Sequence, residues 1–201
     1  MSKNNVAKAY ALVYVEKRLG REIICVNYIY MRDIHNFNNT SDYLSILNGV
    51  LITDLSVILL LIGGFIKSNV LKKWYKDLSL SAVIADVLII VIGIIIARFL
   101  YPYIFKSYSL IKFILLAVLI QVIHDILFYF LCTSIKRGRS HILDIFKDYG
   151  KEMGSGAIVA DSLMMVSSIL IASYLKGLTL NTNIITLIIG VYLVPYMIYS
   201  L

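Results

Sequence analysis

Five long apolar segments, separated by short polar connections, dominate the pattern of hydrophobic and polar positions along this chain of 201 residues. Each holds about 20 mostly apolar residues, the length that a helix needs to cross the roughly 30 Å hydrocarbon core of a bilayer. Backbone groups in lipid must be hydrogen-bonded within their own segment, so we predict helices even where Ile, Val and Tyr would favour strands in water. The predicted fold is therefore an all-α, polytopic transmembrane helix bundle, with spans near residues 44–66, 79–101, 110–132, 155–176 and 182–200.

Two regions outside these spans complete the predicted organisation. Residues 1–43 carry mixed charge with interleaved tyrosines, and we expect one or two short helices at the membrane surface there. Residues 140–153 place apolar side chains three and four positions apart with charged residues between them, which is typical of an amphipathic helix in the membrane interface. The chain thus divides into an N-terminal polar region, 1–43, and a transmembrane bundle, 44–201.

Composition and charge support a multi-pass protein that is integral to a membrane. Hydrophobic residues make up 60% of the chain, more than the roughly half that is typical of soluble domains. The net charge of +7 would suit a nucleic-acid-binding protein, but the basic residues lie between the apolar segments, where membrane proteins keep them. We therefore predict the lipid bilayer as partner, with anionic lipid headgroups at the basic loops 67–78 and 133–154, and no nucleic acid. A homo-oligomer is compatible with this pattern.

Four of the predicted spans each contain one aspartate within the apolar run: Asp54, Asp86, Asp125 and Asp161. At 1.5 Å per residue, the last three lie about 10 Å from the end that carries the basic loops, and Asp54 lies near the midplane. A charged side chain inside a membrane costs about 2.5 to 3.5 kcal/mol on insertion scales, so these residues are expected to face the bundle interior. We predict that the four carboxylates meet in one layer.

Two further polar residues belong to the same candidate cluster. Gln121 lies one helical turn before Asp125, so the two side chains share a face. His124 points about 100° away and is expected to reach a neighbouring helix. The candidate polar or ion cluster therefore comprises Asp54, Asp86, Gln121, His124, Asp125 and Asp161. Clustered carboxylates repel one another when ionised, so they require a proton, a metal cation or a cationic ligand.

We expect the remaining polar and aromatic residues near the span ends to have structural roles at the membrane interfaces. Arg98 falls at the far end of its span and is expected to extend to the outer interface. Tyr101, Tyr103 and Tyr108 are predicted to form an aromatic belt at that interface, and Trp74 and Tyr75 to mark the opposite one. No catalytic or cofactor-binding residue is predicted, because the phosphate-binding loop, HExxH and GxSxG motifs are absent from the sequence.

A resemblance covers about half of the chain, from Trp74 to Leu175. It is carried by the stretches WYKDLSLSAVIADVLIIVIG, QVIHDILFYF and DYGKEMGSGAIVADSLMMVSS. In these stretches the chain resembles uncharacterised small multi-pass membrane proteins of large DNA viruses. That family has no assigned activity, so the resemblance implies only a viral protein in a viral or host internal membrane.

Three functions fit these observations, and the leading one is a non-catalytic membrane scaffold or binding component whose aspartates hold helices together. The alternative is a transport protein in which the aspartate cluster handles a proton or a metal cation. The third is a lipid-modifying membrane enzyme that uses a metal cation as cofactor. An enzyme is the least favoured of the three.

Overall fold

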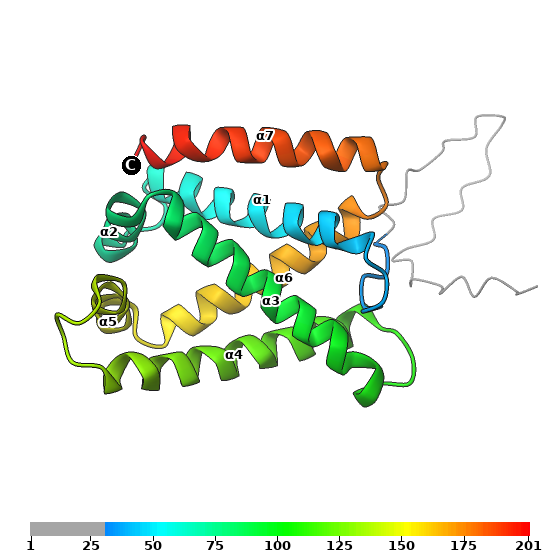
Figure 1. The fold of residues 1–201 in the computed structure, drawn as a ribbon, viewed down its shortest axis with the longest axis horizontal. Coiled ribbons are helices and arrows are strands. Elements are labelled where there is room, and N and C mark those ends of the chain that lie inside the picture. The colour runs from blue at the N-terminus through cyan, green and yellow to red at the C-terminus, as the bar shows by residue number, and fades with distance from the viewer. Residues whose placement is uncertain (1–30) are drawn as a thin grey trace, which may run out of the picture.

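The computed structural model describes residues 31–201, which form helices and short connections without any strand (Figure 1). Five of the helices are long and apolar enough to cross a membrane, which confirms the predicted all-helical fold and the five spans. The chain is therefore a multi-pass membrane protein. The spans are α1 (Asp42–Ile62), α3 (Leu80–Ile104), α4 (Leu110–Ser134), α6 (Gly156–Leu175) and α7 (Leu180–Ile198), and the shorter helices are α2 (Asn69–Leu78) and α5 (His141–Met153).

The helix α1 lies in the middle of the bundle and packs against α6, α7 and α3. The helix α4 completes the opposite side through its contacts with α3 and α6 (Figure 1). Of the five spans α1 is the most buried and α4 the least. The core of the bundle is therefore built around α1.

At Gly49 the spans α1 and α6 approach each other closely. A Cβ atom at this position would lie 2.7 Å from both the backbone nitrogen of Ala172 and the backbone oxygen of Ser168. Small residues let transmembrane helices approach one another closely, and only glycine avoids this contact with backbone atoms.

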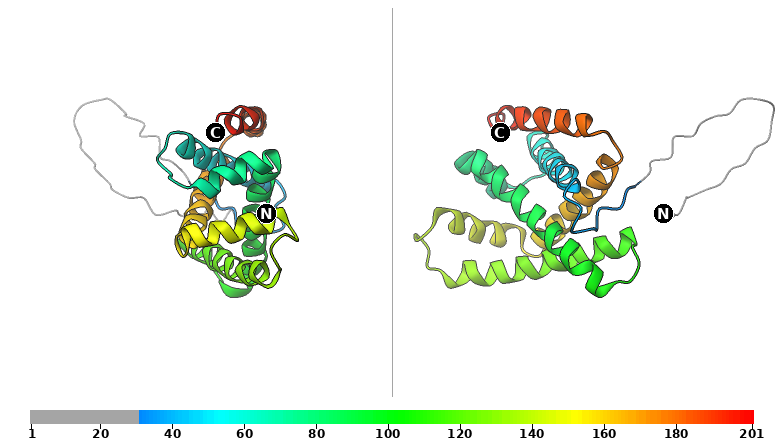
Figure 2. Two further views of the ribbon diagram at one scale, coloured as in Figure 1. Left: turned by 90° about the vertical axis from the view of Figure 1, so that its left-hand side faces the viewer. Right: turned by 45° about the vertical axis from the view of Figure 1, so that its right-hand side comes forward.

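The two short helices, α2 and α5, lie together at one end of the bundle and across the direction of the spans. Figure 2 (left) looks onto this end. We call these two helices the surface pair. The connection 67–78, predicted as a basic loop, is thus largely helical, and its first turn is capped by Ser68, whose Oγ accepts from the backbone N–H of Leu71 at 3.0 Å.

Contacts at both ends and in the middle hold the surface pair together in antiparallel orientation. The Glu152 carboxylate, near the end of α5, accepts from the backbone N–H groups of Asn69 and Val70 at 3.0 Å each, at the start of α2. At the other end, His141 Nε2 lies 3.4 Å from Asp77 Oδ2. The rings of Trp74 and Phe146 pack between these ends, with centroids 4.7 Å apart.

The chain before α1 is described only from residue 31. Residues 31–41 form turns, and the backbone N–H of Arg32 donates to the carbonyl of Ser173 on α6 at 3.0 Å. The remainder of the predicted N-terminal region, residues 1–30, lies outside the described residues, and with it most of the surface helices expected there.

A single residue, Ser79, joins α2 to α3 in a conformation that suits glycine. Its φ is 48° and its ψ is −124°. A non-glycine residue held in such a sparsely populated region costs about 1 to 3 kcal/mol. We therefore expect Ser79→Gly to stabilise the protein by about 1 kcal/mol once the larger backbone entropy of glycine in the unfolded chain is subtracted. Thermal unfolding in detergent measures the change.

The matched control for that substitution is Ser107→Gly in the connection between α3 and α4. Ser107 is exposed, and Ser79 is the only non-glycine residue with positive φ within residues 31–201. Glycine therefore relieves no strain at position 107, and no stabilisation is expected. An equal gain from both substitutions would show that strain at Ser79 is not the cause.

Candidate functional site

Two neighbouring residues of α2 reach into the bundle and donate hydrogen bonds to two of the predicted aspartates. The Tyr75 hydroxyl donates to Asp54 Oδ1 on α1, and Trp74 Nε1 donates to Asp86 Oδ2 on α3, each at 2.9 Å. Asp54 is completely buried. One turn of a surface helix is thus fastened to two spans through their carboxylates.

The electrostatics of Tyr75 agree with its role as a donor. Burial raises the pKa of Tyr75 well above its usual value, and the carboxylates of Asp86 and Asp54 raise it further. The phenol therefore keeps its proton at neutral pH. Because the effect of a charge falls with distance, both carboxylates lie near the same hydroxyl group.

A second tyrosine, Tyr149 on α5, relates the surface pair to the remaining aspartates. Burial raises the pKa of Tyr149 well above its usual value, and Asp161, Asp86, Glu152 and Asp125 add to the shift. Carboxylates from all four spans that carry an aspartate thus act electrostatically on Tyr75 or Tyr149, and those of Asp54 and Asp86 also bond α2 directly. We call Asp54, Asp86, Asp125 and Asp161 the aspartate layer, which lies beneath the surface pair.

Within the layer, Asp125 is held by residues of its own helix. Gln121 Nε2 donates to Asp125 Oδ1 at 2.8 Å, in agreement with their one-turn spacing. His124 was expected to reach another helix, and this expectation is wrong. Its Nδ1 lies 3.2 Å from Asp125 Oδ1, its ring stacks on Phe128, and its side chain is 37% exposed.

Several carboxylate oxygens in the layer have no partner among residues 31–201. Asp54 Oδ2 and Asp125 Oδ2 are both buried without a hydrogen bond. Asp161 on α6 accepts no hydrogen bond and forms no ion pair within that part of the chain. These oxygens can therefore accept protons.

The aspartate layer was considered from the sequence as a possible metal site. Between residues 31 and 201, no three His, Cys, Asp or Glu side chains are arranged to hold a metal ion. Stable metal sites in proteins use three or more such ligands at fixed distances. The layer thus offers hydrogen-bond acceptors and proton sites. For the metal cation that was considered from the sequence, the described residues provide no set of ligands.

A second polar cluster lies at the opposite end of the bundle and was not predicted. Arg98 is completely buried, so the expectation that it extends to the outer interface is wrong. Its Nη2 donates to the carbonyls of Asn36 and Asn39, the latter at 2.9 Å, and lies 3.2 Å from Asp42 Oδ2. Lys176 Nζ lies 2.8 Å from Asp42 Oδ1.

We call Asp42, Arg98 and Lys176 the buried ion cluster. Asp42 begins α1, Arg98 lies late in α3, and Lys176 follows α6, so the cluster joins three spans at one end. The sequence offers no local signal for it: Asp42 lies just before the first predicted span, and Arg98 and Lys176 lie near the ends of two others.

The aromatic belts predicted at the two interfaces are also wrong for three of the five residues, whereas Tyr103 is exposed. Tyr101 is buried, and its hydroxyl donates to the carbonyl of Ser107 at 3.1 Å. Trp74 and Tyr75 are likewise buried, in contact with the aspartate layer. These rings hold connections and surface helices to the bundle.

Comparisons of the chain with protein-family models, with curated proteins and with solved structures find no match. The resemblance to viral membrane proteins therefore stays a prediction. Fold and site together define a class, a multi-pass membrane protein with a polar carboxylate layer beneath a pair of surface helices.

Proposed function

We propose that the protein is a non-catalytic membrane scaffold, in which the aspartate layer fastens the surface pair to the bundle. The main support is the pair of adjacent donors, Trp74 and Tyr75, that bond Asp86 and Asp54 at 2.9 Å. These carboxylates are occupied by the protein's own side chains, as expected of polar groups that hold transmembrane helices together.

In this proposal the outer face of the surface pair binds anionic lipid headgroups. Lys72, Lys73 and Lys76 of α2 are exposed and have no ion-pair partner among residues 31–201. On α5, by contrast, Lys147 lies 3.6 Å from Asp144. A lysine close to an anionic membrane surface contributes about 1 kcal/mol to binding. The lysines of α2 are therefore free to act on lipid phosphates.

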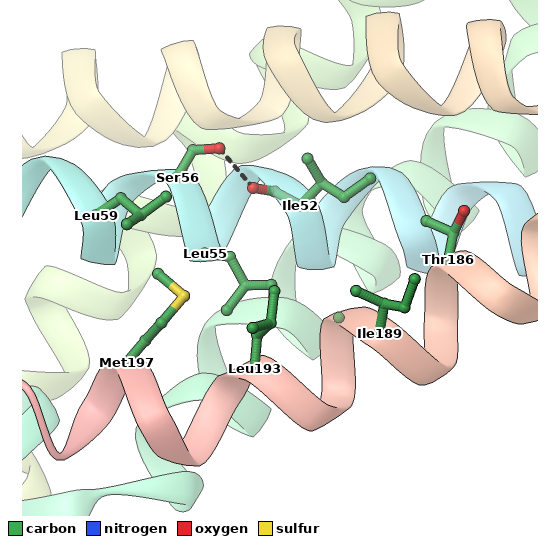
Figure 3. A pocket seen from close by; sticks show the side chains of 9 residues that line it. Ile52, Leu55, Ser56, Leu59, Thr186, Ile189, Leu193 and Met197 are labelled. Carbon is green, nitrogen blue, oxygen red and sulfur yellow. Dashed lines mark hydrogen bonds between the residues drawn. The ribbon is translucent and has the colours of Figure 1, made fainter.

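Two apolar grooves of the described chain lie away from the aspartate layer. One runs between α1 and α7, where Leu55 and Leu59 face Leu193 (Figure 3). Its two polar side chains are bonded to their own helices: the Ser56 hydroxyl donates to the carbonyl of Ile52 at 2.7 Å, and the Thr186 hydroxyl to the carbonyl of Thr182 at 2.8 Å. The other lies between α3 and α7. Neither groove is lined by a layer aspartate, which favours a structural role for the layer over catalysis.

Lipid selectivity tests this proposal. In vesicles that contain phosphatidylcholine and phosphatidylglycerol, we expect the triple variant Lys72→Gln, Lys73→Gln, Lys76→Gln to lose tenfold or more of the preference for phosphatidylglycerol. Lipid that stays bound after mild detergent extraction is counted by native mass spectrometry. The control is Lys106→Gln with Lys112→Gln at the opposite end, which should keep the preference. An unchanged preference in the triple variant would overturn the proposal.

The unpartnered oxygens favour a second candidate function, proton handling across the bundle. Asp54 accepts from Tyr75 with one oxygen and leaves the other free, Asp125 also has one free oxygen, and Asp161 acts electrostatically on Tyr149. Like charges at such positions must share protons. Flux into vesicles loaded with a pH-sensitive dye is the test, because Asp161→Asn would abolish it. No flux above that of empty vesicles with the unaltered protein would exclude this candidate.

A further inference from the structure

The groove between the start of α3 and the last turns of α7 encloses about 360 Å³. Its walls are apolar, with Leu80 on α3 and Val191, Pro195 and Ile198 on α7. From Val191 to Tyr199 the groove extends about 12 Å along the helix. These dimensions and this lining suit a hydrocarbon chain and leave no room for a folded partner.

One end of the groove is polar and adjoins the surface pair. Ser79 and Tyr199 lie at this end, the first at the junction of α2 and α3 and the second directly after α7. The Ser79 hydroxyl is only weakly held, because its bond to the carbonyl of Lys76 is 3.5 Å long. Lys76 lies in the last turn of α2 and is exposed. A hydroxyl and a phenol thus line this end of the groove, and the exposed Lys76 lies three residues before Ser79, at the end of the bundle where lipid headgroups lie.

We propose that this groove binds one acyl chain of an anionic phospholipid, whose phosphate lies against Lys76 and Ser79. The inference rests on the proposed function, because the basic face of the surface pair supplies the positive charge. It adds one defined binding site for a single lipid molecule. Charge complementarity decides the occupant. A second copy of the chain would bring its own lysines against Lys76, whereas an anionic headgroup neutralises it.

Groove-filling variants test the site. Val191→Trp adds a large ring at an exposed position of the groove wall, and Val159→Trp adds the same ring at a similarly exposed position on α6, outside the groove. The full chain is reconstituted in phosphatidylcholine with a minor share of phosphatidylglycerol, extracted in mild detergent and examined by native mass spectrometry. We expect the unaltered protein and Val159→Trp to retain one phosphatidylglycerol, and Val191→Trp to retain at least tenfold less.

Two further variants keep the test independent of folding. Leu80→Trp fills the groove from α3, where Leu80 is exposed, and it should reproduce the loss if Val191→Trp fails to fold. Lys76→Gln should reduce retention, whereas Lys106→Gln should not. Full retention of phosphatidylglycerol in both groove-filling variants, Val191→Trp and Leu80→Trp, would contradict lipid binding in the groove. Equal retention of phosphatidylcholine would contradict the preference for an anionic headgroup. If only the triple lysine variant loses selectivity, the groove is wrong and the proposed function stands.

Discussion

Asp42→Ala is expected to destabilise the protein by about 3 to 5 kcal/mol, because it removes the counter-charge from a buried cation. Asp42 and Arg98 are both completely buried, with Asp42 Oδ2 and Arg98 Nη2 3.2 Å apart. Arg98 already has two unpartnered donors, Nε and Nη1, among the described residues. Without Asp42 its charge would be left with two carbonyl oxygens and the face of the Tyr43 ring, and no counter-charge on Arg98 would remain from Asp42. Equilibrium unfolding in detergent measures the loss.

The matched control for this substitution is Asp148→Ala. Asp148 forms an ion pair with Arg137 at 2.5 Å, but both side chains are substantially exposed, so little change in stability is expected. The double variant Asp42→Ala, Arg98→Met should recover part of the loss, since the fully buried guanidinium is gone and Lys176, which is 24% exposed, keeps its hydrogen bond to the carbonyl of Asp33. If Asp42→Ala costs no more than Asp148→Ala, the buried ion cluster does not stabilise the bundle.

Gly49→Ala is expected to destabilise the protein by about 3 kcal/mol, the upper end of the usual range for overpacking. The added Cβ would lie 2.7 Å from backbone atoms of Ala172 and Ser168, and backbone cannot move aside as a flexible side chain can. The spans α1 and α6 would have to separate over their contact. Thermal unfolding in detergent detects the change.

The control is Gly150→Ala in the interior of α5, where a Cβ atom would meet nothing within 4 Å. Alanine is a better helix former than glycine by about 1 kcal/mol, so this variant should be slightly more stable than the unaltered protein. The two substitutions are therefore expected to act in opposite directions. A shift of the same sign and size in both would show that α1 and α6 tolerate separation at Gly49.

The five spans could be predicted from the sequence because the bilayer fixes both length and composition. A run of about 20 apolar residues has no alternative to a helix in lipid. The similar depth of the aspartates in the membrane could also be predicted, because the number of residues along a helix converts directly to a distance. The contact between Gln121 and Asp125 follows for the same reason, because it lies within one helix.

The helix α2 and its contacts could not be predicted in the same way. Four lysines in residues 67–78 made this connection look like a loop, although Ser68 is a good N-cap. A tryptophan that faces headgroups and one that faces a buried carboxylate have the same sequence signature. The rotation of α2 about its axis decides between them, and composition does not determine it.

The buried ion cluster was missed because its members are distant in sequence. Asp42 precedes the first predicted span and so was not counted among the intramembrane aspartates. Arg98 near a span end usually extends to the interface, and only residues 31–41, folded over the end of α3, prevent this. No local pattern connects positions 42, 98 and 176.

Hydrogen exchange of the α2 amides tests most directly whether the aspartates fasten the surface pair. Two double variants are compared with the unaltered protein: Asp54→Asn with Asp86→Asn, and Asp54→Ala with Asp86→Ala. Asparagine keeps an oxygen that can accept from Tyr75 and Trp74, whereas alanine removes it. We predict unchanged protection over Asn69–Leu78 in the asparagine variant and much faster exchange in the alanine variant. Equal protection of α2 in the alanine variant and the unaltered protein would contradict the proposed role of the aspartate layer.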